Sequence, residues 1–463
     1  MRPLLLLLAA ALAAQAQTAG KPNPVVQEIV SKISADHIAA TLKKLESFGS
    51  RGDYTDPTQT DRGIGAARRW IYDQFRSYSP KLEVAFDPYM VKKQGRIFRD
   101  VELVNVLAVL PGTTNPEKRI VISGHYDSLN IVRRANLSPT AAEDGGANVI
   151  DNEKSADAPA PGVSDDASGT AAVMELARVL SQYKFEKTLV FVTFAGEEIG
   201  LVGASLMAEK VKNEKQQIEA VLNNDIIGND VGGDGQTANR LVNVFSDDPG
   251  DSPSRTLARY VKETAERYVP GMKANPVFRA DRFGRGGDHT PFAASGFAAV
   301  RFTTPVENLQ LQHSANDTLD KASPAYTAMV AKVNAAAAAS LALAPSAPQV
   351  NRVVTTAGPN QGRAQPNLGR GKSMYDATLR WTDPKPAADL AGYSVVMRNT
   401  TSPFWETEIF VGKVNEYTLP GLNIDMFILG VKSIDNDGNQ SLVAPYVSAP
   451  YAVRKIELVE EKK

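Results

Sequence analysis

Histidine and acidic residues follow several short apolar runs of the sequence, in positions where they could share one site. In chain order these are His125 with Asp127 after residues 120–123, Glu197 with Glu198 after 188–194, and Asp225 after 220–223. The carboxyl ends of parallel strands converge on one crevice of an open sheet, so we expect these side chains to meet there. A mixture of imidazole and carboxylate groups is a ligand set that suits zinc.

Two further segments carry residues of the same kinds. Asp165 and Asp166 lie in the segment 162–169, directly before a predicted helix, and His313 lies in 311–318, outside any clear helix. An acidic residue before a helix commonly acts as its N-cap, and a lone loop histidine is commonly solvated, so each has an ordinary alternative. Several carboxylates in one crevice repel one another without a countercharge, and the whole set therefore predicts a pair of zinc ions.

Composition excludes several other kinds of chemistry. The chain contains no cysteine, which excludes thiol nucleophiles, cysteine-ligated zinc, iron–sulfur clusters and disulfides. The 51 basic and 52 acidic residues leave a formal charge of −1, so no global attraction to nucleic acid or an anionic membrane follows. Any metal site must use His, Asp and Glu.

The elements that must position these residues alternate between strands and helices over residues 24–344. The short, apolar runs that predict strands are 103–110, 119–123, 187–194, 220–223, 241–245 and 298–302. The periodic runs that predict helices are 169–183, 201–211, 255–268 and 324–344. This alternation predicts an α/β domain with a mostly parallel central sheet flanked by helices.

Residues 345–450 are expected to form a linker followed by a small all-β sandwich. Proline and glycine break the pattern after 344, and short strand-like runs follow at 377–381, 392–398, 406–411, 416–419, 426–434 and 443–448. The runs Leu379-Arg380-Trp381, Asp389-Leu390-Ala391-Gly392-Tyr393 and Tyr417-Thr418-Leu419 resemble those of a fibronectin type III domain. Trp381 is the expected core anchor, and the module is expected to bind a surface or polymer or to stabilise the rest of the protein.

The sequence patterns at the two ends of the chain predict a signal peptide and a charged tail. Residues 1–16 resemble a secretory signal peptide, with an apolar run at 4–14 that is too short to span a membrane. No lipoprotein cysteine follows, so we expect a secreted or periplasmic protein with no membrane span. A large exported domain without disulfides suits a bacterial protein, and residues 451–463 form a charged tail.

The order of these motifs resembles the M28 family of co-catalytic zinc aminopeptidases over roughly residues 40–340. The motifs are His-x-Asp at 125–127, Asp-Asp-Ala-Ser-Gly at 165–169, Glu-Glu at 197–198, Asp225 and His-x-x-x-Asp-Thr at 313–318, with 46–51 upstream and 287–292 near the end. Membership implies two zinc ions and peptide or protein substrates.

The resemblance also assigns a role to each residue. His125 and Asp225 would bind one zinc ion, Glu198 and His313 the other, and Asp165 would bridge them. Asp127 would orient His125, and Glu197 would be the general base. Two zinc ions about 3.5–4 Å apart can activate one shared water, so no nucleophilic side chain is required.

Which end of a peptide substrate is cleaved remains open at this point. Asp288, His289 and Arg285 lie in a glycine-rich loop that either lines the substrate pocket or is a solvated surface. An aminopeptidase is the leading prediction. A carboxypeptidase or dipeptidase of the same family could instead hold a substrate carboxylate with Arg279, Arg282 or Arg285.

Two more distant alternatives are a glutaminyl cyclase and a non-catalytic binding protein. The cyclase group places tryptophans around its zinc site, whereas this chain has only Trp70, Trp381 and Trp405, and neither Gly203 nor Gln312 is aromatic. A binding protein on a degenerate scaffold predicts losses among the metal residues, and none of the expected positions is substituted.

Overall fold

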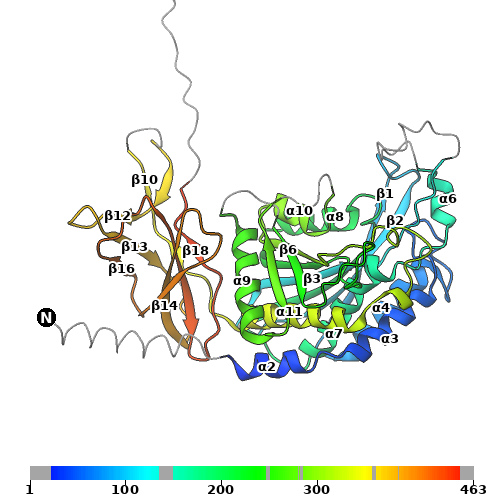
Figure 1. Ribbon diagram of the computed structural model, residues 1–463, viewed down its shortest axis with the longest axis horizontal. Coiled ribbons are helices and arrows are strands. Elements are labelled where there is room, and N and C mark those ends of the chain that lie inside the picture. The colour runs from blue at the N-terminus through cyan, green and yellow to red at the C-terminus, as the bar shows by residue number, and fades with distance from the viewer. Residues whose placement is uncertain are drawn as a thin grey trace, which may run out of the picture. The chain divides into compact units, whose positions relative to one another are not determined.

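The computed structural model describes residues 22–134, 150–246, 251–279, 281, 285–356, 361–383 and 385–448 (Figure 1). The expected signal peptide and the charged tail lie outside these ranges. Two compact units are present: one comprises Pro22–Leu343, and the described residues from Ala344 onward belong to the other. Each unit is described by itself.

The first unit is built on an eight-stranded sheet in the order β1-β2-β4-β3-β5-β8-β6-β7. The strands are β1 (Glu83–Val91), β2 (Val101–Leu110), β3 (Asn115–His125), β4 (Lys187–Phe194), β5 (Gln217–Asn224), β6 (Leu241–Phe245), β7 (Lys273–Val277) and β8 (Ala299–Thr303). Strands β4, β3, β5 and β8 are parallel neighbours, as are β6 and β7. The pairs β1–β2, β2–β4 and β6–β8 are antiparallel, so the sheet is mixed, and parallel pairing dominates only at its centre.

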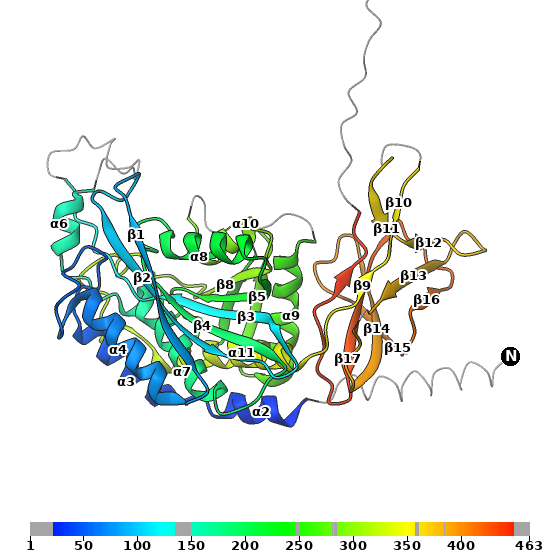
Figure 2. The ribbon, with the colours of Figure 1, turned by 180° about the vertical axis from the view of Figure 1, so that it is seen from behind.

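Helices cover both faces of this sheet (Figure 2). They are α2 (Pro24–Ser31), α3 (Ala35–Ser47), α4 (Gly63–Tyr78), α6 (Asn152–Asp157), α7 (Ser168–Leu180), α8 (Val202–Asn213), α9 (Pro253–Tyr268), α10 (His289–Ala294) and α11 (Pro324–Leu343). Helices α7 and α11 contact the central strands on one face, whereas α10 and α8 lie together on the other. Phe194 of β4, Met207 of α8 and Phe292 of α10 belong to the buried cluster that joins this second helical layer to the sheet.

The parallel centre of the sheet brings three predicted site segments to one edge. Strand β3 ends at His125, which is in register with Phe194 at the end of β4, and Asp225 directly follows β5. Because β4, β3 and β5 are neighbours that run in the same direction, their carboxyl ends lie side by side, as expected from the sequence.

The start of α7 packs very closely against this edge. A β-carbon on Gly169 would lie 2.3 Å from both the backbone oxygen of Asn224 and Oδ2 of Asp166. Only glycine fits there without a shift of the backbone, because no side-chain rotation relieves a contact made by a β-carbon. Gly169 therefore lets the helix that follows Asp165 and Asp166 approach β5.

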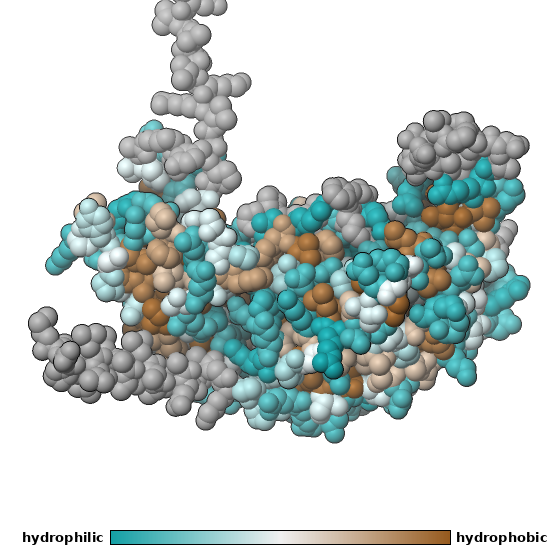
Figure 3. Space-filling model, viewed as in Figure 1, coloured by the Kyte–Doolittle hydropathy of each residue, from teal (hydrophilic) through white to brown (hydrophobic). Residues whose placement is uncertain are grey.

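Helix α11 is long and apolar enough to cross a membrane, but 83% of its apolar window is buried inside the unit. It packs against α2, α7 and α9. Its alanine run, from Ala335 to Ala339, is fully or almost fully buried, as in the core helix of a globular domain. The outer surface of the unit, in contrast, mixes hydrophilic and hydrophobic residues on the face shown in Figure 3.

The second unit contains two antiparallel sheets around one core. One sheet has the order β12-β13-β16 with β9 also paired to β13, and the other has the order β15-β14-β17-β18. The strands, including the β10–β11 hairpin, are β9 (Gln349–Val350), β10 (Arg352–Val354), β11 (Ala364–Pro366), β12 (Leu368–Gly369), β13 (Ala377–Thr382), β14 (Leu390–Asn399), β15 (Thr407–Gly412), β16 (Glu416–Leu419), β17 (Phe427–Asp435) and β18 (Ala444–Pro445). Trp381 is fully buried between residues of both sheets, where its ring meets that of Tyr393 edge-on.

The segment expected to be a linker is structured in part. Strands β9 and β12 pair with β13, so they add to the sheet that contains Trp381. Residues 435–439 form a tight turn after β17, in which one oxygen of Asp435 accepts the backbone amides of Asp437 and Asn439. The carboxylate of Asp435 therefore serves the backbone donors of this turn.

Candidate metal centre

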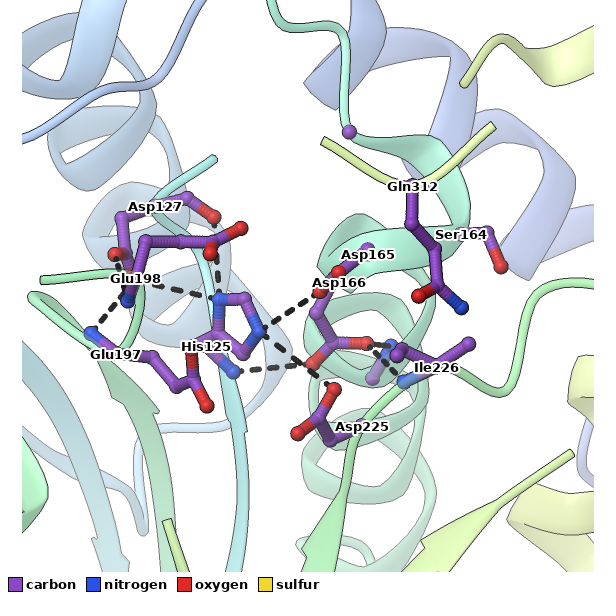
Figure 4. A network of polar contacts seen from close by, with 12 residues as sticks. His125, Asp127, Ser164, Asp165, Asp166, Glu197, Glu198, Asp225, Ile226 and Gln312 are labelled. Atoms are coloured by element: carbon purple, nitrogen blue, oxygen red, sulfur yellow. Dashed lines mark hydrogen bonds and ion pairs between the residues drawn. The ribbon is translucent and has the colours of Figure 1, made fainter. Parts of the chain in front are cut away.

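Six buried or partly buried side chains form two groups that could each hold a metal ion. The first group is His125, Asp166 and Asp225, and the second is Asp165, Glu198 and His313. Within each group one ligand atom per residue lies within 4.8 Å of the others. All five residues expected to bind zinc are therefore brought together, and Asp166 joins them. Figure 4 shows four of the five, His125, Asp165, Glu198 and Asp225, together with Asp166.

Asp165 lies between the two groups. Its Oδ1 is 3.2 Å from Nε2 of His125, and its Oδ2 is 3.2 Å from Nε2 of His313. Asp225 approaches the same nitrogen of His125 at 3.7 Å, and Glu198 approaches His313 at 3.0 Å. A carboxylate with one oxygen toward each histidine has the position required of a bridging ligand.

The buried polar atoms of this cluster fit a divalent cation. Nε2 of His125 and Oε1 of Glu198 are buried without a hydrogen-bond partner. Burial alone would lower the pKa of His125, but Asp127, Asp165 and Asp225 raise it well above its usual value. The pKa of His313 is raised to about 11, and the largest cause is the negative charge of Glu198. The cluster therefore stabilises positive charge at both histidines, and the neutral imidazole and carboxylate donors are zinc ligands.

Asp127 joins the histidine to the segment that carries the two glutamates. Its Oδ1 lies 3.3 Å from Nδ1 of His125, and its two oxygens accept the backbone amides of Glu197 at 3.4 Å and Glu198 at 3.1 Å. The side chain is fully buried. Asp127 therefore orients the ring of His125 and also fixes the turn after β4.

Asp166 serves the backbone more than the ligand cluster. Its Oδ2 accepts the amide of His125 at 3.1 Å, and its Oδ1 accepts the amides of Gly169 at 2.8 Å and Ile226 at 3.3 Å. The alternative of a helix-capping acid thus describes Asp166, whereas Asp165 faces the histidines. Ile226 has φ of 59°, an uncommon conformation for a β-branched residue, and this hydrogen bond helps to hold it.

Asp225 forms an ion pair with a buried arginine that was not among the residues expected at the site. Nε of Arg301 on β8 lies 3.1 Å from Oδ2 of Asp225, and Nη1 lies 2.7 Å from Oδ2 of Asp281. Burial alone would lower the pKa of Arg301, but these two carboxylates raise it above its usual value. Arg301 therefore pairs with Asp225 and fixes its orientation.

Asp317 and Arg51 position the loop of Asp165. Asp317 accepts the backbone amides of Ser164 at 2.8 Å and Asp165 at 2.9 Å, and burial raises its pKa to about 7. Arg51 is fully buried and donates to backbone oxygens at four positions, including Tyr126 and Gly162. Both residues belong to motifs recognised in the sequence, but their roles became visible only in the folded chain.

An open cavity of about 410 Å³ lies over the cluster. The described residues that line it include Asp165, Glu197, Glu198, Asp225, Arg285 and His313. Glu197 is partly exposed there, and burial, Asp225 and Glu198 raise its pKa well above the usual value against the opposing charge of His125. A carboxylate with a raised pKa that faces a metal cluster is suited to proton transfer.

The glycine-rich loop contributes to this cavity in part. Arg285 lines the cavity, where it pairs with Glu307 at 3.1 Å and donates to Gln312 at 3.3 Å. Asp288 and His289 are fully buried, and neither is among the described residues that line the cavity. Their expected role in substrate binding is not supported by this placement. Arg282, a further candidate, lies outside the described residues.

Comparison with known sequences identifies relatives over most of the chain. The family model of peptidase family M28 matches residues 105–338. A probable zinc metalloprotease of Leptosphaeria maculans is 35% identical over 451 residues, which cover 91% of this chain and 96% of the relative. A probable zinc metalloprotease of Pyricularia oryzae is 34% identical and is covered over 84% of its length. These relatives are fungal, so they give no support to the expected bacterial origin.

Comparison with solved structures identifies the same fold in two kinds of enzyme. The LapA aminopeptidase of Legionella pneumophila has a TM-score of 0.51 at 19% identity, with 70% of this chain and 76% of that chain covered. The glutaminyl cyclase of Macrostomum lignano also has a TM-score of 0.51, at 16% identity, with 68% of this chain and 91% of that chain covered. At these identities the similarity concerns the fold alone.

Proposed function

This chain belongs to peptidase family M28 and is a zinc metallopeptidase, and from that premise we propose that it is a secreted two-zinc aminopeptidase. The observation that carries the proposal is the position of Asp165, which has one oxygen toward His125 and the other toward His313. Each histidine has its own carboxylate neighbour, Asp225 or Glu198. A carboxylate between two histidine–carboxylate pairs is a donor arrangement that suits two ions.

The proposed reaction is hydrolysis of the first peptide bond of a peptide. Bound zinc supplies Lewis acidity, which polarises the scissile carbonyl and acidifies water. Glu197 is the general base: it lines the cavity, lies beside the ligand Glu198 and takes a proton from the attacking water. The same carboxyl group then gives that proton to the leaving amine, so the chain needs no covalent intermediate.

Cleavage at the amino end is favoured by the state of Arg285, one of the three arginines named above as able to hold a substrate carboxylate. Arg285 is already paired with Glu307 and hydrogen-bonded to Gln312, so a carboxypeptidase would have to displace these partners. A cyclase is disfavoured because the described residues that line the cavity include no tryptophan, and Trp70 packs against Phe48.

The direct test uses one peptide in blocked and unblocked forms. We expect cleavage of a peptide with a free amino end, no cleavage after its acetylation, and no effect of amidation at its carboxyl end. Release of residues is measured by mass spectrometry with and without a chelator. Release from the carboxyl end of the acetylated peptide would contradict the proposal and identify a carboxypeptidase.

We also propose that the second unit is a fibronectin type III-like module that binds a surface, a polymer or a large substrate. The support is its strand order, with two antiparallel sheets around Trp381, and the fact that every proposed ligand lies in Pro22–Leu343. Secretion rests on the signal-peptide pattern of residues 1–16.

Ending the chain after Ala344 is expected to leave kcat on small peptides unchanged, because the first unit has its own core. Activity on large or insoluble proteins is expected to fall. Steady-state kinetics on both kinds of substrate, with a thermal melt of the truncated protein, measure the two effects. If the truncated protein matched the full-length protein on both kinds of substrate, the module would have a stabilising role and no binding role. If the truncated protein did not fold, the first unit would depend on the module.

A further inference from the structure

A chain of buried ion pairs leads from the metal cluster to a loop beside it. Arg301 of β8 is fully buried, and its guanidinium lies between two carboxylates. Its Nε is 3.1 Å from Oδ2 of Asp225, and its Nη1 is 2.7 Å from Oδ2 of Asp281. Both acidic residues are buried as well. The series Asp281–Arg301–Asp225 therefore ends at a proposed metal ligand.

Arg301 divides the two carboxylate oxygens of Asp225. Oδ2 faces the guanidinium, whereas Oδ1 lies 3.7 Å from Nε2 of His125 and faces the cluster (Figure 4). Nη2 of Arg301 also donates to the backbone oxygen of Asp225 at 3.5 Å. One guanidinium thus holds both the side chain and the backbone of this ligand, and Oδ1 is the oxygen directed at an ion.

The same guanidinium contacts residues 285–287, which we call the cavity loop. Nη1 of Arg301 donates to the backbone oxygen of Gly286 at 3.3 Å. A β-carbon on Gly287 would lie 3.0 Å from Cδ of Arg301, so the loop backbone packs tightly against this side chain. Arg285 and Gly286 both line the cavity over the cluster. The position of Arg301 therefore affects a metal ligand and the wall of the cavity together.

Two carboxylates at different nitrogens fix the orientation of a guanidinium. The group is planar and presents its N–H donors in a rigid fork. Asp281 makes the shorter of the two contacts, at Nη1. Without Asp281, the buried positive charge would lose one of its two carboxylate partners and would shift relative to Asp225.

We propose that Asp281 is a positioning residue of the metal centre, which acts through Arg301 on the ligand Asp225 and on the cavity loop. Asp281 belongs to neither group of candidate ligands. The effect concerns one of the two ions, because no ion pair among the described residues joins Arg301 to Glu198 or His313. The inference rests on the proposed two-zinc site.

The test measures zinc affinity of the full-length protein by competition with a chelator, which resolves the two bound ions. Asp281→Ala is expected to lower the affinity for one ion by about tenfold, the low end of the range for outer partners of ligands, because it acts through a second residue. The affinity for the other ion is expected to change by less than about twofold. Asp281→Asn is expected to retain most of the affinity, since its amide oxygen can still accept from Arg301.

Arg301→Lys tests the route of this effect. An ammonium group is a point charge that cannot pair with both carboxylates in the geometry of the guanidinium, so the same ion is expected to bind about 10- to 100-fold more weakly. In this background Asp281→Ala is expected to change zinc affinity by less than about twofold, because the two residues act as one unit. KM for a peptide that the parent cleaves is expected to rise in both single variants, because the cavity loop is less firmly held.

Glu219→Ala is the matched control. Glu219 pairs at 2.8 Å with Lys187, which is fully buried. This pair lies near the start of β5, whereas Asp225 follows the end of the same strand. The control removes a buried ion pair of the same sheet, so it is expected to lower the melting temperature and to leave both zinc affinities at the parent values.

Four results would overturn the inference. Parent affinities in Asp281→Ala would show that Asp281 positions nothing, and an equal loss at both ions would show a merely structural role. An equal loss in Asp281→Asn would show that the charge matters instead of the contact. An undiminished effect in the Arg301→Lys background would show that Asp281 acts elsewhere. Should Asp281→Ala not fold, Asp281→Ser takes its place, because its hydroxyl ends one bond short of the carboxylate oxygens.

Zinc affinity also separates this inference from the proposed activity. A parent protein that binds two ions and cleaves no peptide would contradict the proposed peptidase activity alone, and the variants would still decide the role of Asp281. A parent protein that binds fewer than two ions would contradict both the proposed zinc site and the inference.

Discussion

Replacing Glu197 by Gln is expected to lower kcat by about 10²- to 10⁴-fold while zinc stays bound. The amide has nearly the same shape as the carboxylate but cannot accept a proton from water. Glu198→Gln is expected to act in the opposite way, because Glu198 contacts His313 at 3.0 Å within the ligand cluster. It should weaken zinc binding by at least about tenfold. Steady-state kinetics and zinc content per chain separate the two effects.

Glu209→Gln is the matched control for this pair. Glu209 is an exposed residue of α8, 11 positions beyond Glu198, and it takes no part in the ligand cluster. The control should match the parent in both kcat and zinc content. The roles of Glu197 and Glu198 would be exchanged if Glu197→Gln lost zinc and Glu198→Gln kept it with a low kcat.

Removal of zinc is expected to abolish peptidase activity, and re-addition of two equivalents per chain is expected to restore it. Asp165→Ala should lower the affinity for both ions, because Asp165 contacts His125 and His313, whereas His313→Ala should affect mainly one. Zinc uptake by the metal-free protein should release protons near neutral pH. The reason is that the pKa of each histidine is raised in the metal-free cluster, so each is protonated there and must become neutral to bind metal.

Metal analysis, titration of activity with zinc and the pH change of an unbuffered solution measure these effects. Asp234→Asn is a suitable control, because Asp234 is exposed and its carboxylate bonds to Gln236. Full activity of the metal-free protein would refute the metal mechanism. One equivalent of zinc that restored full activity would refute the requirement for two ions.

The sequence predicted the ligand cluster because its members follow strands that the structure places side by side. His125 ends β3, and Asp225 follows β5, so the parallel pairing of the two strands is enough to bring them together. His313 has no such position. Its assignment depended on the motif with Asp317, and the structure shows that Asp317 accepts the amide of Asp165.

The edges of the sheet were harder to predict than its centre. Strands β1 and β7 were not expected, and each contains a proline, Pro88 or Pro276. Proline is tolerated at an edge, because one side of an edge strand has no ladder hydrogen bond to lose. Strand β1 is also largely exposed or half-buried, so it lacks the apolar pattern by which the central strands were recognised.

Other site residues could not be found from the sequence because their roles depend on distant contacts. Arg301 lies within a buried strand and meets Asp225, which is 76 positions earlier in the chain. A charged residue inside an apolar strand, such as Arg301, was the one local signal available, since a fully buried charge requires a partner.

The hydrogen bonds of Asp166 bear on whether the chain folds before or after it binds metal. Its single carboxylate receives amides from the end of β3, the first turn of α7 and the residue after Asp225. The three segments that present the ligands are thus joined by protein atoms alone, unlike a zinc finger, whose chain folds only around its metal. The scaffold can be complete before any ion arrives. Metal supply would then govern when the enzyme becomes active, and it would not govern whether the chain folds.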